Sequence, residues 1–219
     1  FQETAPEHVR KASKWIIGPW AHADKGHPEG SLLNFLKKFL NKGWFDYWLK
    51  DEKDAFPELE EPPIKYYVIG KGIWRHANHW PPNGSTETDV YLHSNGQANS
   101  LNGDGILTFA EPGTAEPSDR YEFDPMDPVI TRGGRNLDLL KGAWDQRKGE
   151  KRDDVLGYTS EHLEKGVEIT GNVKMILHAS SSAKDTDFMV KLVDVLPRGK
   201  ALNIVDGGIR ARFRNGMEQ

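Results

Sequence analysis

Phe188-Met189-Val190-Lys191-Leu192-Val193-Asp194-Val195 is a short run rich in β-branched and aromatic residues, and the turn cluster Pro197-Arg198-Gly199 follows it. A run of this composition that ends in turn residues is typical of a β-strand. Runs of the same kind occur at 65–70, 88–93, 167–171 and 173–178. Many short strands with long irregular connections predict a mainly β fold, a jelly-roll β-sandwich that we expect to be galactose-binding-like.

The pattern before these strands is different. Lys14-Trp15-Ile16-Ile17-Gly18 is a short apolar run closed by glycine, which predicts a buried strand of a parallel sheet. From Ser31, a suitable N-cap, apolar residues recur at steps of three and four, which predicts an amphipathic helix over 31–40. Gly43 leaves open whether this helix continues to Leu49 or breaks.

A charged segment with three prolines separates the two patterns. It runs over 51–63 and contains Pro57, Pro62 and Pro63, which is the composition of a domain linker. We therefore predict three parts. Residues 1–50 form the C-terminal remnant of a first domain, 51–63 the linker, and 64–219 a β-sandwich domain truncated at its C-terminus.

The composition excludes several classes of protein. The 219 residues include 33 acidic and 29 basic side chains, so there is no excess positive charge for a nucleic acid or an anionic membrane surface. The sequence contains no run of about 18 apolar residues, which is the length that a membrane-spanning helix needs. The absence of cysteine excludes a disulfide framework, a thiolate metal site and a cysteine nucleophile. We expect a soluble, cytoplasmic protein.

Both ends of the sequence read as cuts. The chain opens at Phe1 with no initiator methionine and no signal peptide, and it closes on a charged, alternating stretch that ends at Gln219. We therefore expect it to be part of a longer polypeptide.

The stretch Gly18-Pro19-Trp20-Ala21-His22 carries the main candidate for catalysis. His22 comes just after a predicted buried strand and before a predicted helix, where α/β-hydrolase folds place the histidine of the catalytic triad. An imidazole suits a general base because its pKa lies near the working pH. The alternative is a loop histidine that only forms local hydrogen bonds.

No metal site is predicted. His76 and His79 have a spacing that could ligate zinc, but no third or fourth ligand accompanies them in the sequence, so we expect them in an aromatic-rich loop. Asn102-Gly103-Asp104-Gly105 lacks the spaced acidic ligands of a calcium loop and is predicted to be a turn.

Other chemically suggestive stretches favour structural roles. Ser180-Ser181-Ser182 has no Gly-x-Ser-x-Gly elbow, and we expect it at the entrance to a strand. Asp185 and Asp187 share a strand face, where their repulsion must be relieved by solvent or by a basic partner. Gly133-Gly134 follows proline-rich sequence rather than a strand, so it is weak as a nucleotide site.

Read together and in order, a set of phrases resembles one family, the CocE/NonD hydrolases. This family includes cocaine esterase, α-amino acid ester hydrolases, glutaryl-cephalosporin acylases and X-Pro dipeptidyl-peptidases. The phrases are Ile17-Gly18-Pro19-Trp20-Ala21-His22, Trp80-Pro81-Pro82, Phe123-Asp124-Pro125-Met126-Asp127-Pro128, Gly133-Gly134, Asp145-Gln146-Arg147, Arg152-Asp153-Asp154-Val155-Leu156, Tyr158-Thr159-Ser160, Asp185-Thr186-Asp187-Phe188 and Lys191-Leu192-Val193-Asp194-Val195. The resemblance extends from about Ile16 to Arg214.

The resemblance implies a serine hydrolase with an α/β-hydrolase domain, a helical cap and a C-terminal jelly roll. Residues 1–50 would then hold the last strand, the catalytic-histidine loop and the final helix of the hydrolase domain. His22 matches the family's catalytic histidine. The nucleophilic serine, the triad aspartate and the oxyanion-hole donors are expected upstream of Phe1, so we expect this chain alone to be inactive.

Two functions remain in competition. The first is part of a hydrolase that cleaves an ester, acyl-amide or X-Pro peptide bond through an acyl-enzyme, with no cofactor, and with the rest of the hydrolase domain as its partner. The rival is a non-catalytic β-sandwich module that binds carbohydrate or peptide. The sequence leaves open which substrate is used and whether copies of the chain associate.

Overall fold

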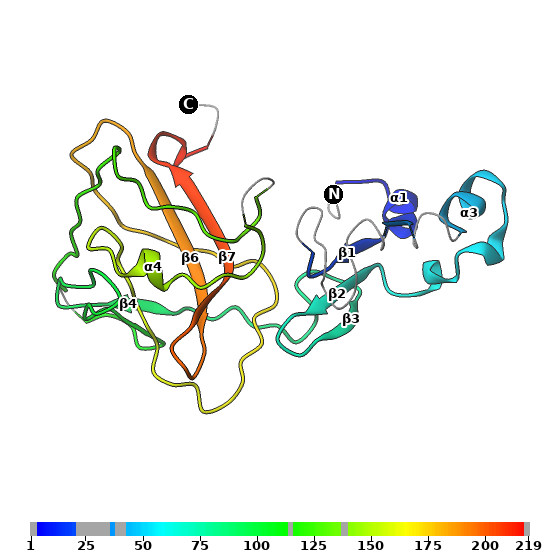
Figure 1. The fold of residues 1–219 in the computed structure, drawn as a ribbon. Coiled ribbons are helices and arrows are strands. Elements are labelled where there is room, and N and C mark those ends of the chain that lie inside the picture. Colours follow the sequence, from blue (N-terminus) through cyan, green and yellow to red (C-terminus); the bar gives the residue numbers. More distant parts are fainter. Residues whose placement is uncertain (1–3, 21–35, 38–42, 114–115, 137–139, 217–219) are drawn as a thin grey trace. The chain divides into compact units, whose positions relative to one another are not determined.

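The computed structural model of the chain describes residues 4–20, 36–37, 43–113, 116–136 and 140–216 (Figure 1). This part of the protein is mainly β, and its strands form one three-stranded and two two-stranded sheets. It divides into two compact units, Phe1–Thr86 with Ile169–Val173, and Glu87–Glu168 with Lys174–Gln219. No helix among the described residues is both long and apolar enough to cross a bilayer.

The first unit contains a small mixed sheet and several short helices. Its elements are α1 (Glu7–Ala12), β1 (Trp15–Ile17), α3 (Phe45–Leu49), η2 (Lys53–Ala55), η3 (Pro57–Glu60), β2 (Ile64–Val68) and β3 (Ile73–Ala77). The strand order is β1-β2-β3, with β1 parallel and β3 antiparallel to β2. The predicted strand is therefore confirmed at Trp15–Ile17, with parallel pairing to β2. It is exposed to half-buried rather than buried, and its sheet is mixed rather than parallel.

Alternation along β2 gives this sheet two different faces. Ile64 and Tyr66 are buried and form a core with Ala77 of β3. Trp80 packs on the same cluster, with its ring centroid 5.6 Å from that of Tyr66. Because successive side chains of a strand point to opposite faces, Lys65 and Tyr67 lie on the other side of β2.

The second unit is organised around a long hairpin. Its elements are β4 (Tyr91–His93), β5 (Ile106–Thr108), α4 (Arg147–Glu150), β6 (Asp187–Val195), β7 (Ala201–Arg210) and η4 (Ala211–Phe213). β6 and β7 lie side by side as an antiparallel pair with an irregularity between Leu192 and Val193 (Figure 1). In the turn between them, which the Pro197-Arg198-Gly199 cluster predicted, the amide of Leu196 donates to the carbonyl of Lys200 at 2.9 Å and the amide of Gly199 donates to the carbonyl of Leu196 at 2.7 Å.

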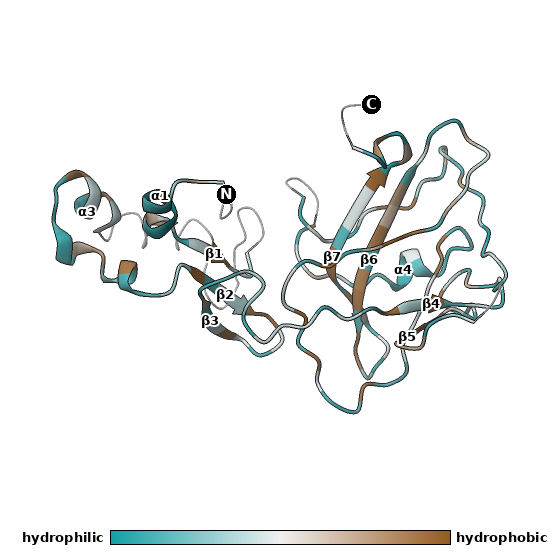
Figure 2. Cartoon of the chain, turned by 180° about the vertical axis from the view of Figure 1, so that it is seen from behind, coloured by the Kyte–Doolittle hydropathy of each residue, from teal (hydrophilic) through white to brown (hydrophobic). Residues whose placement is uncertain are grey.

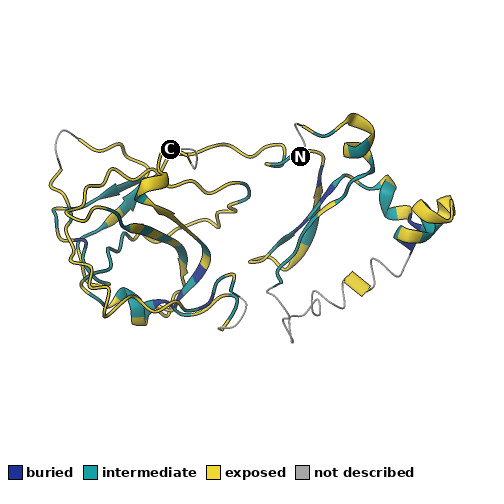
Figure 3. Cartoon of the chain, turned by 90° about the horizontal axis from the view of Figure 1, so that it is seen from above, coloured by how far each residue is buried: buried dark blue, intermediate teal, exposed yellow. Residues whose placement is uncertain are grey.

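Fully buried side chains are concentrated at a small number of places. Figure 3 shows mostly exposed and half-buried segments in each unit, and among the described residues of the second unit the buried ones are Ala98, Gly133, Gln146, Ala201 and Asn203. Figure 2 shows hydrophobic residues along β6, in contrast to the hydrophilic α1. On β6, Phe188, Val190 and Leu192 are half-buried and alternate with exposed residues, so one face of the hairpin packs inward.

Two of the predicted strands are wrong. Residues 167–171 and 173–178 have no strand structure although they contain Val167, Ile169 and Ile176. These side chains are largely exposed, so the apolar alternation that predicted strands here does not correspond to burial against the described residues. Conversely, β3, β5 and β7 were not predicted.

The helix predicted over 31–40 lies outside the described residues except for Leu36 and Lys37, which are helical. Gly43 has a left-handed φ of +104°, and residues 43–44 form a π-helical turn directly before α3. The question whether the helix over 31–40 continues to Leu49 falls on 38–42, which lie outside the described residues.

The segment 51–63 is more structured than its composition suggests. It holds η2 and η3, and Phe56 within it is only 2% exposed. The strands on its two sides, β1 and β2, pair in one sheet, and the division between the compact units follows Thr86. The contact division thus differs from the predicted boundary at 51–63.

Candidate functional site

The loop after β1 carries the candidate base. β1 is held against β2 in the register Trp15↔Ile64 to Ile17↔Tyr66, and the amide of Trp15 donates to the carbonyl of Pro63 at 2.8 Å. Gly18, Pro19 and Trp20 follow the strand and are described, whereas His22 lies outside the described residues. The structure therefore describes the first part of the loop that leads to His22.

The aromatic ring of Trp20 folds back over this loop. It packs against Trp74 of β3, with the ring centroids 5.7 Å apart and an interplanar angle of 44°. Tyr67 of β2 packs on Trp74 in turn, with the centroids 5.2 Å apart. The start of the loop is thus connected through three aromatic rings to the β2–β3 hairpin.

The two histidines of the rejected zinc site are separated by the structure. His76 lies on β3 and not in a loop, which corrects the prediction for this residue, whereas His79 follows the strand and is exposed. The Nε2 atom of His76 lies 3.0 Å from Oε2 of Glu61, a carboxylate that sequence spacing did not associate with it. No group of three or more metal-ligating side chains gathers within the described residues.

The Asp145-Gln146-Arg147 motif forms a polar network in the second unit. The Nε2 group of Gln146 donates to the carbonyls of Arg132 and Trp144 at 2.9 and 2.8 Å, and its Oε1 accepts from Lys191 of β6 at 2.8 Å. Arg147 holds Asp145 through two guanidinium nitrogens. The motif thereby joins α4 to the β6–β7 hairpin.

Electrostatics distinguish the two acids of this network. Hydrogen bonding from Arg147 is the main cause that holds the pKa of Asp145 well below its usual range. Burial raises the pKa of Glu150, and the nearby Asp145 carboxylate raises it further. Asp145 is therefore a fixed anion in a structural ion pair.

A second ion-pair network joins two further sequence motifs, 123–128 and 152–156. Arg152 binds both carboxylate oxygens of Asp154 at 2.7 Å, and it also donates to the backbone carbonyl of Asp127 at 2.6 Å. Hydrogen bonding from Arg152 lowers the pKa of Asp154. The guanidinium group of Arg152 thus connects two motifs that lie about 25 residues apart in the sequence.

Tyr158, in the sequence motif 158–160, donates a hydrogen bond to the half-buried carboxylate of Asp119. Its hydroxyl donates to Oδ2 of Asp119 at 2.6 Å, and Ser94 donates to the same oxygen at 2.6 Å. Burial opposes ionisation of Asp119, but these hydrogen bonds, with one from the amide of Ala98, lower its pKa. Burial, followed by the hydrogen bond to Asp119, raises the pKa of Tyr158. Asp119 therefore connects the segment 94–98 to Tyr158 through hydrogen bonds.

Of the two alternatives predicted for Asp185 and Asp187, solvent or a basic partner, the structure shows basic partners. Arg210 stands opposite Asp187 in the β6–β7 register and binds both of its carboxylate oxygens. Arg212 pairs with Asp185 at 2.5 Å. The two carboxylates therefore neutralise two arginines at one end of the hairpin, which is a structural role.

Sequence reasoning missed His93 on β4. Its Nδ1 lies 2.6 Å from Oε1 of Glu116, and its Nε2 lies 2.9 Å from the carbonyl oxygen of Ala110. Hydrogen bonding to Glu116, then to Ala110, raises the pKa of His93. No spacing could have identified this site, because its partners come from two loop positions 17 and 23 residues away.

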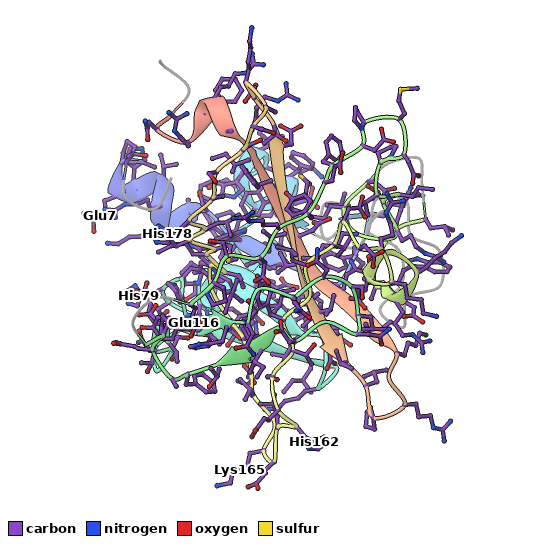
Figure 4. All side chains as sticks on the ribbon, turned by 90° about the vertical axis from the view of Figure 1, so that its left-hand side faces the viewer. Glu7, His79, Glu116, His162, Lys165 and His178 are labelled. Atoms are coloured by element: carbon purple, nitrogen blue, oxygen red, sulfur yellow. The ribbon has the colours of Figure 1, made fainter. Side chains whose placement is uncertain are left out.

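The remaining candidates are local turns. Asp104 accepts a hydrogen bond from the amide of Asn95 at 3.0 Å, and the Ser181 hydroxyl accepts one from the amide of Ala183 at 3.1 Å. Gly133 and Gly134 both have positive φ. Figure 4 shows His162 and Lys165 near the tip of a loop, and both are exposed.

The described residues do not contain a catalytic dyad. No hydrogen bond between a serine hydroxyl and a histidine ring occurs in 4–20, 36–37, 43–113, 116–136 or 140–216; the ring partners are carboxylates and a carbonyl. The arginine–carboxylate and amide networks can hold loops in place, and they do not form a nucleophile with its base.

Comparisons with known proteins show the family to which most of the chain belongs. Residues 58–219 match the family described as the X-Pro dipeptidyl-peptidase C-terminal non-catalytic domain. The chain is 38% identical over 215 residues to cocaine esterase of Rhodococcus sp. (strain MB1 Bresler), covering 94% of this chain and 37% of that protein. It is 28% identical over 218 residues to a protein of Mycobacterium bovis (strain ATCC BAA-935 / AF2122/97) named as a candidate serine esterase, covering 92% and 31%.

One solved structure is similar to this chain over almost its whole length. The crystal structure of an aminopeptidase from a marine sediment archaeon, Thaumarchaeota archaeon, superposes with a TM-score of 0.69 at 25% identity, and the match covers 96% of this chain and 36% of that one. The chain thus spans about a third of the length of the proteins that it matches. His22 lies before residue 58, outside the part that matches the non-catalytic domain.

Proposed function

Because the chain belongs to the family of X-Pro dipeptidyl-peptidase C-terminal non-catalytic domains, we propose that it is the C-terminal part of a serine hydrolase that cleaves ester or amide bonds through an acyl-enzyme. In this proposal residues 58–219 supply the non-catalytic β domain. A catalytic domain supplies the nucleophilic serine, the triad acid and the oxyanion-hole donors.

His22 is the general base of the proposed triad. It would take the proton of the serine hydroxyl during attack and return that proton to the leaving group, while the acid fixes the tautomer of its ring. The proposal is supported by the position of His22 just after β1, in a loop whose start is fixed by packing.

The observation that carries the proposal is the parallel pairing of β1 with β2. All-parallel sheets occur almost only where both faces are covered, and a strand at a sheet edge presents unpaired backbone groups with which a further strand can pair. β1 pairs with β2 on one side only among the described residues, and Trp15 on this strand remains 45% exposed. A further parallel strand from a catalytic α/β-hydrolase domain would extend the sheet at β1.

The second unit makes up most of the β domain of this proposal. Its ion pairs and buried amides hold loops in place, as a rigid wall beside a catalytic domain requires. The ester, acyl-amide and X-Pro peptide substrates remain alternatives, because one fold can host several of these activities and the fold alone does not select among them. A cytoplasmic location stays a prediction.

The rival function is a non-catalytic module that binds carbohydrate or peptide. It is favoured by the description of the matched domain as non-catalytic. It predicts that removing His22 has no effect on any activity of a protein that contains this chain.

A labelling experiment tests the proposal. The complete protein should react with a fluorophosphonate probe and hydrolyse p-nitrophenyl acetate or an X-Pro chromogenic dipeptide, whereas this chain alone should give background rates. Labelling of this chain itself would contradict the assignment of the serine to another domain. An unreactive complete protein would favour the binding module.

A further inference from the structure

Asparagine is followed by glycine at four places in the sequence, at Asn83, Asn95, Asn102 and Asn215. In such a pair the backbone nitrogen of the glycine can attack the side-chain carbonyl carbon of the asparagine, because glycine has no side chain that hinders the approach. All four asparagines are exposed to solvent. Exposure therefore does not separate the four pairs, and the hydrogen bonding of each glycine amide decides between them.

Three of the four glycine amides donate a hydrogen bond. The amide of Gly96 donates to Oγ of Ser94 at 3.1 Å. The amides of Gly103 and Gly216 donate to the backbone carbonyls three residues earlier, at 3.3 and 3.0 Å. A nitrogen that is bound in this way must lose its hydrogen bond before it can attack the preceding side chain.

The amide of Gly84 is different. The turn 82–85 closes through the amide of Ser85, which donates to the carbonyl of Pro82 at 3.1 Å. Gly84 is the third residue of this turn and has a φ of +88°, a position whose amide takes no part in the hydrogen bond of the turn. Within the described ranges no acceptor binds the Gly84 amide.

The space around the glycine gives a second, independent difference. A Cβ atom placed at Gly84 would meet nothing within 4 Å apart from its chain neighbours. At Gly103 it would lie 2.6 Å from the carbonyl oxygen of Gln97, and at Gly96 it would lie 3.4 Å from Cβ of Pro117. The backbone at Gly84 can therefore rearrange without displacing another segment.

We propose that Asn83 is a site of spontaneous modification, where the Gly84 nitrogen attacks Cγ of Asn83 and water completes the conversion to aspartate and isoaspartate. The bond between this nitrogen and Cγ forms, and the proton of the Gly84 amide passes to solvent. The bond from Cγ to Nδ2 then breaks, and the side-chain nitrogen takes up a proton from solvent and leaves as ammonia. The product is a five-membered succinimide ring.

Water opens the succinimide at either of its two carbonyl groups. If the bond from Cγ to the Gly84 nitrogen breaks, residue 83 becomes an ordinary aspartate. If the bond from the main-chain carbonyl carbon breaks, the backbone continues through the side chain as isoaspartate. In total one water is consumed and one ammonia is released, and no oxidant, reductant or cofactor takes part.

The modification changes the exposed segment 83–90, which lies at the division between the two units. It adds one negative charge to a segment that already contains Glu87 and Asp89, so the protein becomes more acidic than its formal net charge of −4. Isoaspartate also lengthens the backbone by one methylene group. The aged protein is thus a substrate for an enzyme that methylates isoaspartyl carboxylates.

The test incubates the folded protein at mildly alkaline pH and follows each site by mass spectrometry after digestion with trypsin and a glutamyl endopeptidase. The digest places Asn83 in peptide 76–87, Asn95 and Asn102 in peptide 88–120, and Asn215 at the start of the last peptide. We expect conversion at Asn83 to be about tenfold faster than at the other three sites, because each of these must first lose a hydrogen bond. An isoaspartyl methyltransferase with labelled S-adenosylmethionine should label peptide 76–87 first.

Unfolding in urea is the matched control, because it removes the hydrogen bonds of all four pairs, and the four rates should then become similar. In the folded protein, Ser94→Ala removes the acceptor of the Gly96 amide and should speed conversion at Asn95 while leaving Asn83 unchanged. Asn83→Gln should abolish the acidic form that appears first.

Three results would overturn the proposal. The first is that Asn83 stays unmodified in the folded protein, or that another of the four sites is converted as fast. The second is that Asn83 leads by the same factor in urea, since its neighbours in the sequence and not the free amide of Gly84 would then set the rate. The third is that Ser94→Ala leaves the rate at Asn95 unchanged.

Discussion

The side-chain amides of Gln146 and Asn203 face each other in the interior of the second unit, where Nε2 of Gln146 donates to Oδ1 of Asn203 at 3.1 Å. The two residues are only 5% and 6% exposed. Oδ1 of Asn203 also accepts from the backbone amide of Trp144 at 2.7 Å. This one oxygen atom therefore connects the Asp145-Gln146-Arg147 motif to β7.

Replacement of Asn203 should be costly. In Asn203→Ala the Trp144 amide loses its acceptor and Gln146 loses one of its partners, and a buried polar group left without a partner costs about 2 kcal/mol. Urea denaturation should show this decrease in the free energy of unfolding. Asn102→Ala, at an exposed turn position, is the control and should change stability little. Equal effects of the two variants would mean that the network does not stabilise the fold.

The stability of the protein should depend on the protonation of His93. Its pKa is raised by Glu116 and the Ala110 carbonyl, so the folded state binds the proton more tightly than the unfolded state, whose pKa is about 6.5. The stabilisation is complete below that pH and is lost as the pH rises through the raised pKa of the folded state.

Thermal unfolding between pH 5 and 9 would measure this effect. The difference in Tm between the original chain and His93→Gln should be largest at the acidic end of this range and shrink as the pH rises. His162→Gln, on an exposed loop, is the matched control. A His93→Gln difference that grows with pH would contradict the arrangement of acceptors around the ring.

Strands could be predicted from the sequence where their own apolar residues supply the side that packs inward. The run 188–195 and the run 65–70 correspond to β6 and β2, since half of each strand packs inward. β7 was missed because Asn203, Asp206 and two glycines interrupt its apolar pattern, and its structure depends on pairing with β6. The runs 167–171 and 173–178 have the right composition, but no described partner strand pairs with them.

The candidate site was less accessible to sequence reasoning. The loop after β1 could be predicted from the order strand, glycine and proline. The packing of Trp20 on Trp74 could not, because 54 positions separate them and aromatic residues are common in this unit. For Asp185 and Asp187 the sequence predicted only that solvent or a basic partner relieves their repulsion. The register of β6 with β7 places Arg210 opposite Asp187, and Arg212 forms an ion pair with Asp185.

Limited proteolysis should distinguish the predicted linker from the observed division. Residues 83–90 are all exposed and lie at the division between the units, whereas 51–63 contains η2, η3 and the buried Phe56. A glutamyl endopeptidase should therefore cut after Glu87 before it cuts after Glu58, Glu60 or Glu61. A first cut within 51–63 would support the boundary that the sequence predicted.

The measurement that tests the central claim most directly is the kcat of His22→Ala in the complete protein. We expect the kcat of the variant to fall by several orders of magnitude with the fold intact. The activity of the wild-type protein should rise as the pH passes through about 6.5, where a histidine deprotonates. His79→Ala, at an exposed position after β3, should leave kcat nearly unchanged. If His22→Ala retained more than about a tenth of the wild-type kcat, His22 would not be the base, since loss of a triad base costs far more than that.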